Sequence, residues 1–292
     1  METGNCRVTR APFKEPCRMK ISVITTLYNR PEHIRLLAAA LALQTRVPDE
    51  LVVADDGSDE ATAEALARLL PSCGFPAKVV RQEKDGDRRS AARNLAIRAA
   101  TGDYLLFLDC DMAPLPDAVA VHERRAAPGR LLCGNRALLD EAATRALFAA
   151  RPAPADADWE QAWERADRGE LEAAARLFRR HARLRRWHLA RPHKPKLLGC
   201  HFSLFREDVE RINGFDENYV GWGYEDDDFA RRLYKAGVAP FSVIDEARML
   251  HLWHASMAPQ ALKRRRDRPN RAYFRRWGVP ARCENGLRKP GA

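Results

Sequence analysis

The sequence has no long hydrophobic segment. Its longest apolar run, Leu36 to Leu43, is far too short to span a bilayer. Residues 1–18 contain no apolar block of the kind found in secretory signals. Apolar residues make up 46% and charged residues 31% of the 292 positions, as in soluble globular proteins. This length suffices for one large α/β domain, or two small ones, with a substantial core.

The sequence also lacks paired cysteines and internal repeats. Its seven cysteines are odd in number, scattered, and include no Cys-x-x-Cys pair. This pattern argues against a disulfide framework and against structural zinc, and it predicts reduced thiols in a cytoplasmic protein.

Positive charge is plentiful and concentrated. The formal net charge is +10, and nine Lys and Arg residues lie between Arg176 and Lys196 without one acidic residue. A second basic block lies between Lys263 and Arg276. Such blocks suit phosphate-bearing partners, namely nucleotides, nucleic acid or an anionic membrane surface. Solvated helix faces are the alternative interpretation.

Strand-like and helix-like patterns alternate in the first part of the chain. Short β-rich runs at 21–26, 51–54, 77–80 and 104–108 are separated by stretches with helical spacing. Parallel strands need such crossovers, so we expect an α/β fold with a mostly parallel central sheet and helices on both faces.

The second half is less regular. Residues 138–190 are rich in Ala, Arg and Glu, which predicts a helical insert. An apolar stripe from Trp159 to Leu184 indicates core packing, with a partner- or membrane-facing surface as the alternative. Further strands are expected at 197–205, 240–244 and 249–253. The expected organisation is a loose extension (1–18), one domain (19–254, divided into 19–135, a helical insert at 138–195 and 196–254) and a basic helix with a loose tail (255–292).

Four polar clusters follow apolar runs: Tyr28–Arg30, Asp55–Ser58, Asp109–Asp111 and Glu225–Asp227. In open α/β sheets, ligands bind beyond the carboxyl ends of the strands, so the clusters are expected to converge on one nucleotide crevice. Carboxylates there suit a hard divalent cation. Solvated aspartates, or acidic capping of a helix in the case of the last cluster, are the alternatives.

These clusters lie in segments that resemble a known family. The segments "ISVITTLYNRPEHI", "VVADDGSDE", "ARNLAIRAATGDYLLFLDCDM" and "INGFDENYVGWGYEDDDFARRL" are similar to family 2 glycosyltransferases of the GT-A fold. The last one resembles the C-terminal half of the β-1,4-galactosyltransferase and chondroitin-polymerase type enzymes. The resemblance covers residues 19–125 and 197–254, but neither the insert nor the tail.

The resemblance implies a donor site and a metal site. Asp56 is expected to contact the uracil or ribose of a UDP-sugar, above the Tyr28–Arg30 loop, and Arg93 is expected near the diphosphate. The implied donor-binding residues are Thr26, Tyr28, Arg30, Asp55, Asp56, Arg93 and Asp109.

Mn²⁺ or Mg²⁺ is the implied cofactor. Asp111 and His254 match the family's metal ligands, and His251 lies where a second late ligand is found. The spacing of His251 and His254 places them on opposite faces of a regular strand, so both can bind one ion only if the chain bends there.

The resemblance implies acceptor and catalytic groups as well. Asp226 matches the base that deprotonates an acceptor hydroxyl in inverting transfer. Glu225 and Asp227 would orient the acceptor or hold the loop. Trp222, with Gly223, would offer a flat surface to a sugar ring on a segment able to close over the substrates.

The resulting prediction is an inverting, metal-dependent transferase that moves a hexose or N-acetylhexosamine from a UDP-sugar to an acceptor hydroxyl in glycan, polysaccharide or glycoconjugate synthesis. The acceptor could be a glycan or a lipid-linked molecule, with the enzyme either free in the cytoplasm or peripheral at the inner face of the membrane. A sugar-nucleotidyltransferase is one alternative, although Leu27–Arg30 is not the glycine-rich loop that such enzymes use. A non-enzymatic protein that binds nucleic acid or an anionic surface is the other.

Overall fold

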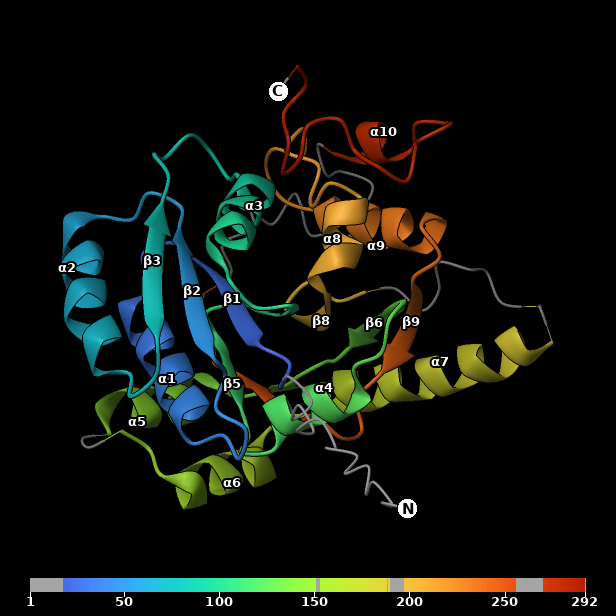
Figure 1. The fold of residues 1–292 in the computed structure, drawn as a ribbon. Coiled ribbons are helices and arrows are strands. Elements are labelled where there is room, and N and C mark those ends of the chain that lie inside the picture. The colour runs from blue at the N-terminus through green and yellow to red at the C-terminus, as the bar shows by residue number, and fades with distance from the viewer. Residues whose placement is uncertain (1–17, 151–152, 188, 190–196, 256–269, 292) are drawn as a thin grey trace, which may run out of the picture.

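The computed structural model describes residues 18–150, 153–187, 189, 197–255 and 270–291 (Figure 1). Its centre is a seven-stranded sheet in the order β3-β2-β1-β4-β8-β6-β9. The strands are β1 (Ile21–Leu27), β2 (Glu50–Asp55), β3 (Ala77–Arg81), β4 (Tyr104–Leu108), β6 (Arg130–Cys133), β8 (His201–Phe205) and β9 (Ala239–Ser242).

Strands β3, β2, β1 and β4 are parallel, as the alternation predicted. Strand β8 is antiparallel to both β4 and β6, whereas β6 and β9 are parallel. Leu108, at the end of β4, pairs with His201, at the start of β8. The start of β8 therefore lies beside the carboxyl end of β4. The residues that precede β8 lie at the same end of the sheet as the residues that follow β4.

Helices cover both faces of the sheet (Figure 1). Apolar residues of α1 (Pro31–Ala42), α2 (Glu60–Leu69) and α4 (Ala118–Arg125) pack in one core cluster. The other face carries α3 (Arg89–Ala99), α8 (Arg206–Arg211) and α9 (Glu225–Lys235). A short 3₁₀ helix, η1 (Leu70–Ser72), follows α2.

Aromatic stacking joins α9 to the sheet. Phe107 of β4 stacks on Phe202 of β8 with ring centroids 4.5 Å apart, and Phe215 stacks on Phe229 of α9 at 4.0 Å. All four rings are almost fully buried. The ring of Phe229 also packs against Phe107 and Phe202, with centroids 6.4 and 5.8 Å apart, and these contacts fix α9 and the acidic residues at its start against the sheet.

A chain of buried polar groups crosses the core. Tyr104 donates to Ser203, which donates to Nδ1 of His122 at 2.6 Å; Nε2 of His122 donates to Nε2 of His201 at 2.8 Å. Nδ1 of His201 donates to the carbonyl of Asn135, which can only accept, and this sets the direction of the whole chain. Burial holds the pKa of His201 at about 4 and that of His122 well below its usual value, so both imidazoles are neutral at pH 7.

A second, three-stranded sheet was not predicted. It has the order β5-β10-β7, formed by β5 (Met112–Pro114), β10 (Met249–His251) and β7 (Ala137–Leu138). Strand β5 directly follows Asp111, and the Leu252 amide donates to the Asp111 carbonyl at 2.8 Å. This sheet therefore brings the two histidines expected as metal ligands beside Asp111.

The described part of the 138–190 segment is mostly helical, as predicted, and contains α5 (Glu141–Ala149), α6 (Asp156–Arg165) and α7 (Gly169–Arg186). Trp159, Trp163 and Phe178 are buried in the core, which confirms core packing for that part of the stripe. Leu177, by contrast, is 46% exposed.

The C-terminal part differs from expectation. Helix α10 (Arg271–Phe274) is short, and the residues after it are not loose, because Cys283 is 2% exposed and Asn213 donates to the Cys283 and Arg288 carbonyls. Residues 1–17 of the expected loose extension (1–18), and the part of the second basic block within 256–269, lie outside the described residues. No helix in the described ranges has the length and apolar character to cross a membrane.

Candidate active site

Asp111, His251 and His254 form a cluster whose ligand atoms all lie within 4.8 Å of one another. His254 Nε2 is 3.0 Å from Oδ2 of Asp111, and His251 Nε2 is 3.7 Å from Oδ1. Strand β10 ends at His251, so the alternation of a regular strand does not apply to His254. If both histidines are to bind one ion, the chain must bend between them, and the end of β10 at His251 provides this bend.

The cluster is charged in the way that a cation site needs. Burial opposes ionisation of Asp111, but the contact with His254 and the neighbouring His251 and Arg30 lower the pKa of its carboxyl to about 2. Burial lowers the pKa of His251, which leaves its imidazole neutral at pH 7 with a lone pair to donate. One anionic and one neutral donor therefore face the same point.

Two observations fit a bound cation. His254 Nδ1 lies 2.9 Å from the Ala255 carbonyl, so Nδ1 carries a hydrogen and Nε2 is the atom that faces the Asp111 carboxylate. A cation placed against both Nε2 and the carboxylate would be bound by the two groups together. In addition, Asp111 Oδ1 is buried and has no hydrogen-bond partner among the described residues. A carboxylate with two imidazoles is a donor set that Mn²⁺ accepts.

Arg93 of α3 lies at the centre of a second, adjoining cluster. Its Nη2 donates to Oδ1 of Asp109 and to the Gly199 carbonyl at 3.4 and 3.3 Å, and its Nη1 is 3.9 Å from Glu225 Oε1. A side chain at Gly199 would place its Cβ 3.2 Å from Asp226 Oδ2 and 3.4 Å from Arg93 Nη2. Glycine there therefore leaves room for both the Asp226 and the Arg93 side chains.

Negative charge is crowded around Arg93. Loss of solvent contact and the neighbouring Asp111 raise the pKa of Asp109, although Arg93 opposes this effect. Burial and the adjacent Asp226 raise the pKa of Glu225. Buried Arg93 Nη1 lacks a hydrogen-bond partner among the described residues, so the guanidinium retains capacity for an anionic ligand.

Arg89 was missed as a candidate. It lies one turn before Arg93 on α3, and the negative charges of Asp87, Glu225 and Asp109 outweigh its burial and raise its pKa. The run of basic residues before α3 was its only signal in the sequence.

The predicted donor residues gather at the ends of β1 and β2. Asp56 accepts from Gln82 Nε2 at 2.6 Å and from Lys84 Nζ at 2.8 Å, and the Lys84 ammonium lies 3.7 Å from the centre of the Tyr28 ring. A Cβ at Gly57, where φ is +74°, would be 2.6 Å from the Lys84 amide nitrogen, so glycine permits this approach. Sequence reasoning did not single out Gln82 or Lys84.

The other predicted donor residues lie around this group. Asp55 turns inward, where it accepts from the Ser58 amide at 2.9 Å and lies 3.4 Å from Arg81. Thr26 lies in β1 opposite Ala54. Arg30 directly precedes α1 and is close enough to Asp111 to lower the pKa of its carboxyl.

The expected acceptor loop leads into α9. Tyr224 adopts a left-handed conformation (φ 75°) just before the helix, and the Asn270 side chain donates to the Gly223 carbonyl at 3.0 Å. Trp222 is half-buried, and Asp226 Oδ1 accepts from the Asp227 amide at 2.8 Å. The C-terminal segment therefore holds the backbone of this loop.

Two segments of the chain match models of known protein families. Residues 22–143 match the family model described as "Glycosyl transferase family 2". This part of the chain is therefore similar to family 2 glycosyltransferases. Residues 178–255 match a second model, described as "N-terminal domain of galactosyltransferase", which ends just after His254. Both resemblances predicted from the sequence are thus confirmed.

Curated relatives of this chain include longer enzymes. The chain is 30% identical to chondroitin synthase from Escherichia coli over 74% of this chain and 32% of the relative. It is 29% identical to validoxylamine A glucosyltransferase from Streptomyces hygroscopicus subsp. limoneus over 83% of this chain and 54% of the relative. The chain thus spans about a third to a half of these two relatives.

Solved structures confirm the GT-A fold. The mannosyltransferase PcManGT from Pyrobaculum calidifontis, in complex with GDP-Man and Mn²⁺, has a TM-score of 0.55 at 20% identity, covering 82% of this chain and 59% of the other. TarS from S. aureus in complex with UDP has a TM-score of 0.54 at 19% identity, covering 80% and 60%.

Proposed function

We propose that this domain is an inverting, Mn²⁺-dependent glycosyltransferase that uses a UDP-sugar and an acceptor hydroxyl. The observation that carries the proposal is the position of the ionised Asp111, which faces His251 and His254 beside the cluster of Arg93 and Asp226. Asp111, His251 and His254, which are suited to bind a cation, are thus proposed to act beside Asp226, a carboxylate that can act as a base.

Each group has a distinct task in the proposed reaction. The acceptor oxygen attacks the anomeric carbon as the bond from that carbon to the diphosphate breaks, and Asp226 takes the hydroxyl proton. Arg93 and Arg89 hold the diphosphate through its oxygens. Asp111, His251 and His254 would hold Mn²⁺, which supplies Lewis-acid stabilisation to the departing nucleoside diphosphate.

Nucleotide selection is proposed for the group around Asp56. Tyr28 offers a ring face to the base, and the Asp56 carboxylate can accept a hydrogen bond from a uracil N–H. In the structure, Lys84 contacts both of these side chains. TarS in complex with UDP-GlcNAc has the same fold, with a TM-score of 0.54, which supports a UDP-sugar carrying a hexose or N-acetylhexosamine.

The test is a thermal-shift and product-release panel of UDP- and GDP-sugars, with Mn²⁺ or with EDTA. We expect a UDP-sugar to raise the melting temperature only with Mn²⁺, and UDP release to require an added glycan acceptor. Stabilisation by GDP-sugars alone would overturn the donor assignment, and transfer that persists in EDTA would overturn the metal requirement.

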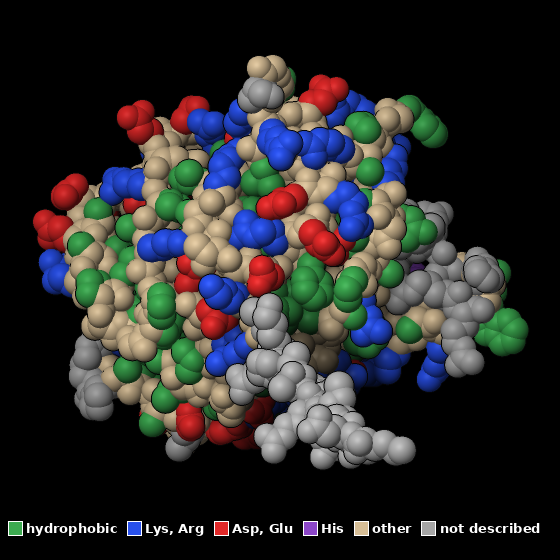
Figure 2. Space-filling model, viewed as in Figure 1, with side chains coloured by type: hydrophobic (Ala, Val, Ile, Leu, Met, Phe, Trp, Pro, Cys, Tyr) green, Lys and Arg blue, Asp and Glu red, His purple; other side chains and the backbone are tan. Residues whose placement is uncertain are grey.

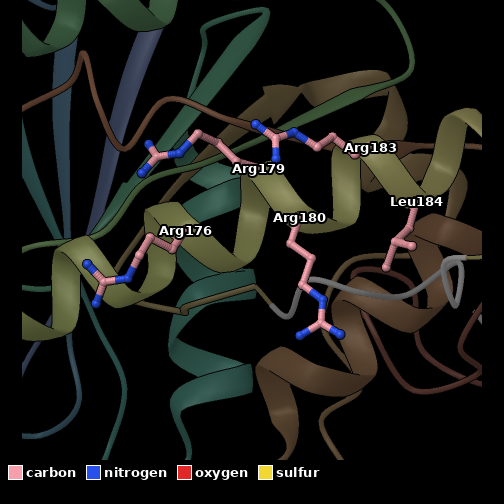
Figure 3. Close-up of a pocket in the computed structure, with 5 residues that line it drawn as sticks. All are labelled: Arg176, Arg179, Arg180, Arg183 and Leu184. Carbon is pink, nitrogen blue, oxygen red and sulfur yellow. The ribbon is translucent and has the colours of Figure 1, made fainter.

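An anionic membrane surface is the partner proposed for α7. Arg176, Arg179, Arg180 and Arg183 line a hollow of about 330 Å³ together with Leu184 (Figure 3). Just beyond the helix, Trp187 and Leu189 are 75% and 73% exposed. On the face in Figure 2, by contrast, basic and acidic side chains are interspersed. Arginines beside exposed apolar groups suit the lipid headgroup region.

Co-sedimentation with vesicles tests this surface. Vesicles with 30% phosphatidylserine should retain the protein at low salt, and Arg180→Glu with Arg183→Glu should release it, whereas Arg68→Glu on α2 serves as a surface control. Equal retention by neutral vesicles, or none at low salt, would contradict the proposal.

A further inference from the structure

The backbone that carries the two histidines of the candidate metal site is held from several sides. The Leu139 amide donates to the His251 carbonyl at 3.0 Å, and the Leu252 amide donates to the Asp111 carbonyl at 2.8 Å. Trp253, the residue before His254, has both backbone groups bonded to side chains, although it lies beyond the end of β10.

Thr144 of α5 makes the first of these side-chain contacts. Its Oγ1 accepts from the Trp253 amide at 2.8 Å, and the residue is fully buried. Helix α5 is fixed at its start by Asp140, whose side chain accepts from the Ala143 amide at 2.7 Å. A residue of the helical 138–190 segment therefore holds the chain directly before His254.

His33 of α1 makes the second contact. Its Nε2 lies 3.3 Å from the Trp253 carbonyl, and because a carbonyl only accepts, Nε2 carries the hydrogen. The His33 ring also packs edge-on against Phe148 of α5 with centroids 4.9 Å apart, and Arg35 donates to the Phe148 carbonyl at 3.0 Å. Helices α1 and α5 are thus tied together behind Trp253.

We propose that Thr144 and His33 are positioning residues that fix Trp253 and thereby pre-set His254 for metal binding. This inference rests on the proposed function. A ligand on an unpaired segment must be ordered when the ion binds, and that conformational entropy reduces affinity. Outer hydrogen bonds that orient a ligand remove this cost. The helical 138–190 segment thereby contributes to metal affinity without touching the ion.

The test measures Mn²⁺ affinity alone, from the loss of the free Mn²⁺ signal in electron paramagnetic resonance, without nucleotide or acceptor. Thr144→Val keeps the shape but removes the acceptor, and His33→Phe keeps the ring beside Phe148 but removes the donor. Each is expected to raise the Mn²⁺ dissociation constant about 10- to 100-fold.

Matched variants separate this effect from general loss of stability. Thr144→Ser restores the hydroxyl and should bind Mn²⁺ like the wild type. Thr62 of α2 is 3% exposed, and Thr62→Val, which also replaces a buried threonine, should leave Mn²⁺ affinity unchanged. Near-ultraviolet circular dichroism reports whether each variant is folded, and His33→Phe carries the test if Thr144→Val does not fold.

The outcomes distinguish the two proposals. Wild-type affinity in both Thr144→Val and His33→Phe would overturn the positioning role while leaving the proposed function standing. A wild-type protein that binds no Mn²⁺ would overturn the metal assignment, and the positioning role with it. Weaker binding in both variants, with recovery in Thr144→Ser, would establish the role.

Discussion

Nε2 of His254 lies 3.0 Å from Oδ2 of Asp111; Asp111 lies in the segment that matches the family 2 model, and His254 lies in the segment that matches the galactosyltransferase model. Asp111 directly precedes β5, and His254 follows β10, the neighbour of β5 in the small sheet. The pairing of β5 with β10, which are far apart in the sequence, therefore determines whether the candidate metal site exists.

The first prediction concerns this pair. Asp111→Asn keeps the size of the side chain but removes the charge, so Mn²⁺-dependent binding of UDP should weaken at least 100-fold. Isothermal titration with UDP, with and without Mn²⁺, measures the effect. Asp245→Asn, at an exposed position, is the matched control. Unchanged Mn²⁺-dependent binding in Asp111→Asn would remove Asp111 from the ligand set.

The second prediction concerns the base. Asp226→Asn should retain UDP binding, because Asp226 belongs to the acceptor side, while the transfer rate falls about 10²- to 10⁴-fold. Single-turnover transfer measured alongside a UDP titration separates the two effects. A variant that transfers at close to the normal rate would show that another group accepts the proton.

The third prediction separates recognition of the diphosphate from recognition of the uracil. Arg93→Met removes the cation between Asp109 and Glu225, and the affinity for UDP should fall about 10- to 100-fold, the value of one or two hydrogen bonds to a charged group. Uridine binding should not change, because the nucleoside carries no phosphate. Arg145→Met, at a side chain that is 71% exposed, is the control. Equal losses for UDP and uridine would point to collapse of the site.

The fourth prediction concerns stability and pH. Burial lowers the pKa of His201 to about 4, and burial together with His201 lowers that of His122. Both groups therefore stabilise the fold fully above pH 6.5, and this contribution is lost as the pH falls towards 4, because the unfolded chain takes up protons first. Each histidine contributes a slope of up to about 1.4 kcal/mol per pH unit.

Urea unfolding at pH 7 and pH 5 tests this slope. His122→Gln replaces one titrating group by a neutral amide with a donor and an acceptor, so the stability should depend less on pH than in the wild type. A wild-type free energy of unfolding that is equal at both pH values would contradict the prediction.

Local sequence patterns determined the elements of the fold. The alternation of β-rich runs and helical spacing predicted four parallel strands, which the structure confirms, since the period of apolar residues depends only on neighbouring positions. The polar clusters that follow apolar runs likewise indicated Asp56, Asp111 and Asp226 as candidate site residues. Those residues sit at chemically recognisable motifs, and the family resemblance assigned their roles.

Tertiary structure decided what depends on pairing between distant segments. The direction of β8, the small sheet and the end of β10 at His251 follow from long-range contacts that no local pattern encodes. The same holds for Lys84 on Asp56, because a surface lysine gives no signal in the sequence that it will turn inward. Thr144 and His33 looked like ordinary helix residues, and only the packing of α5 and α1 behind Trp253 brings them to the metal site.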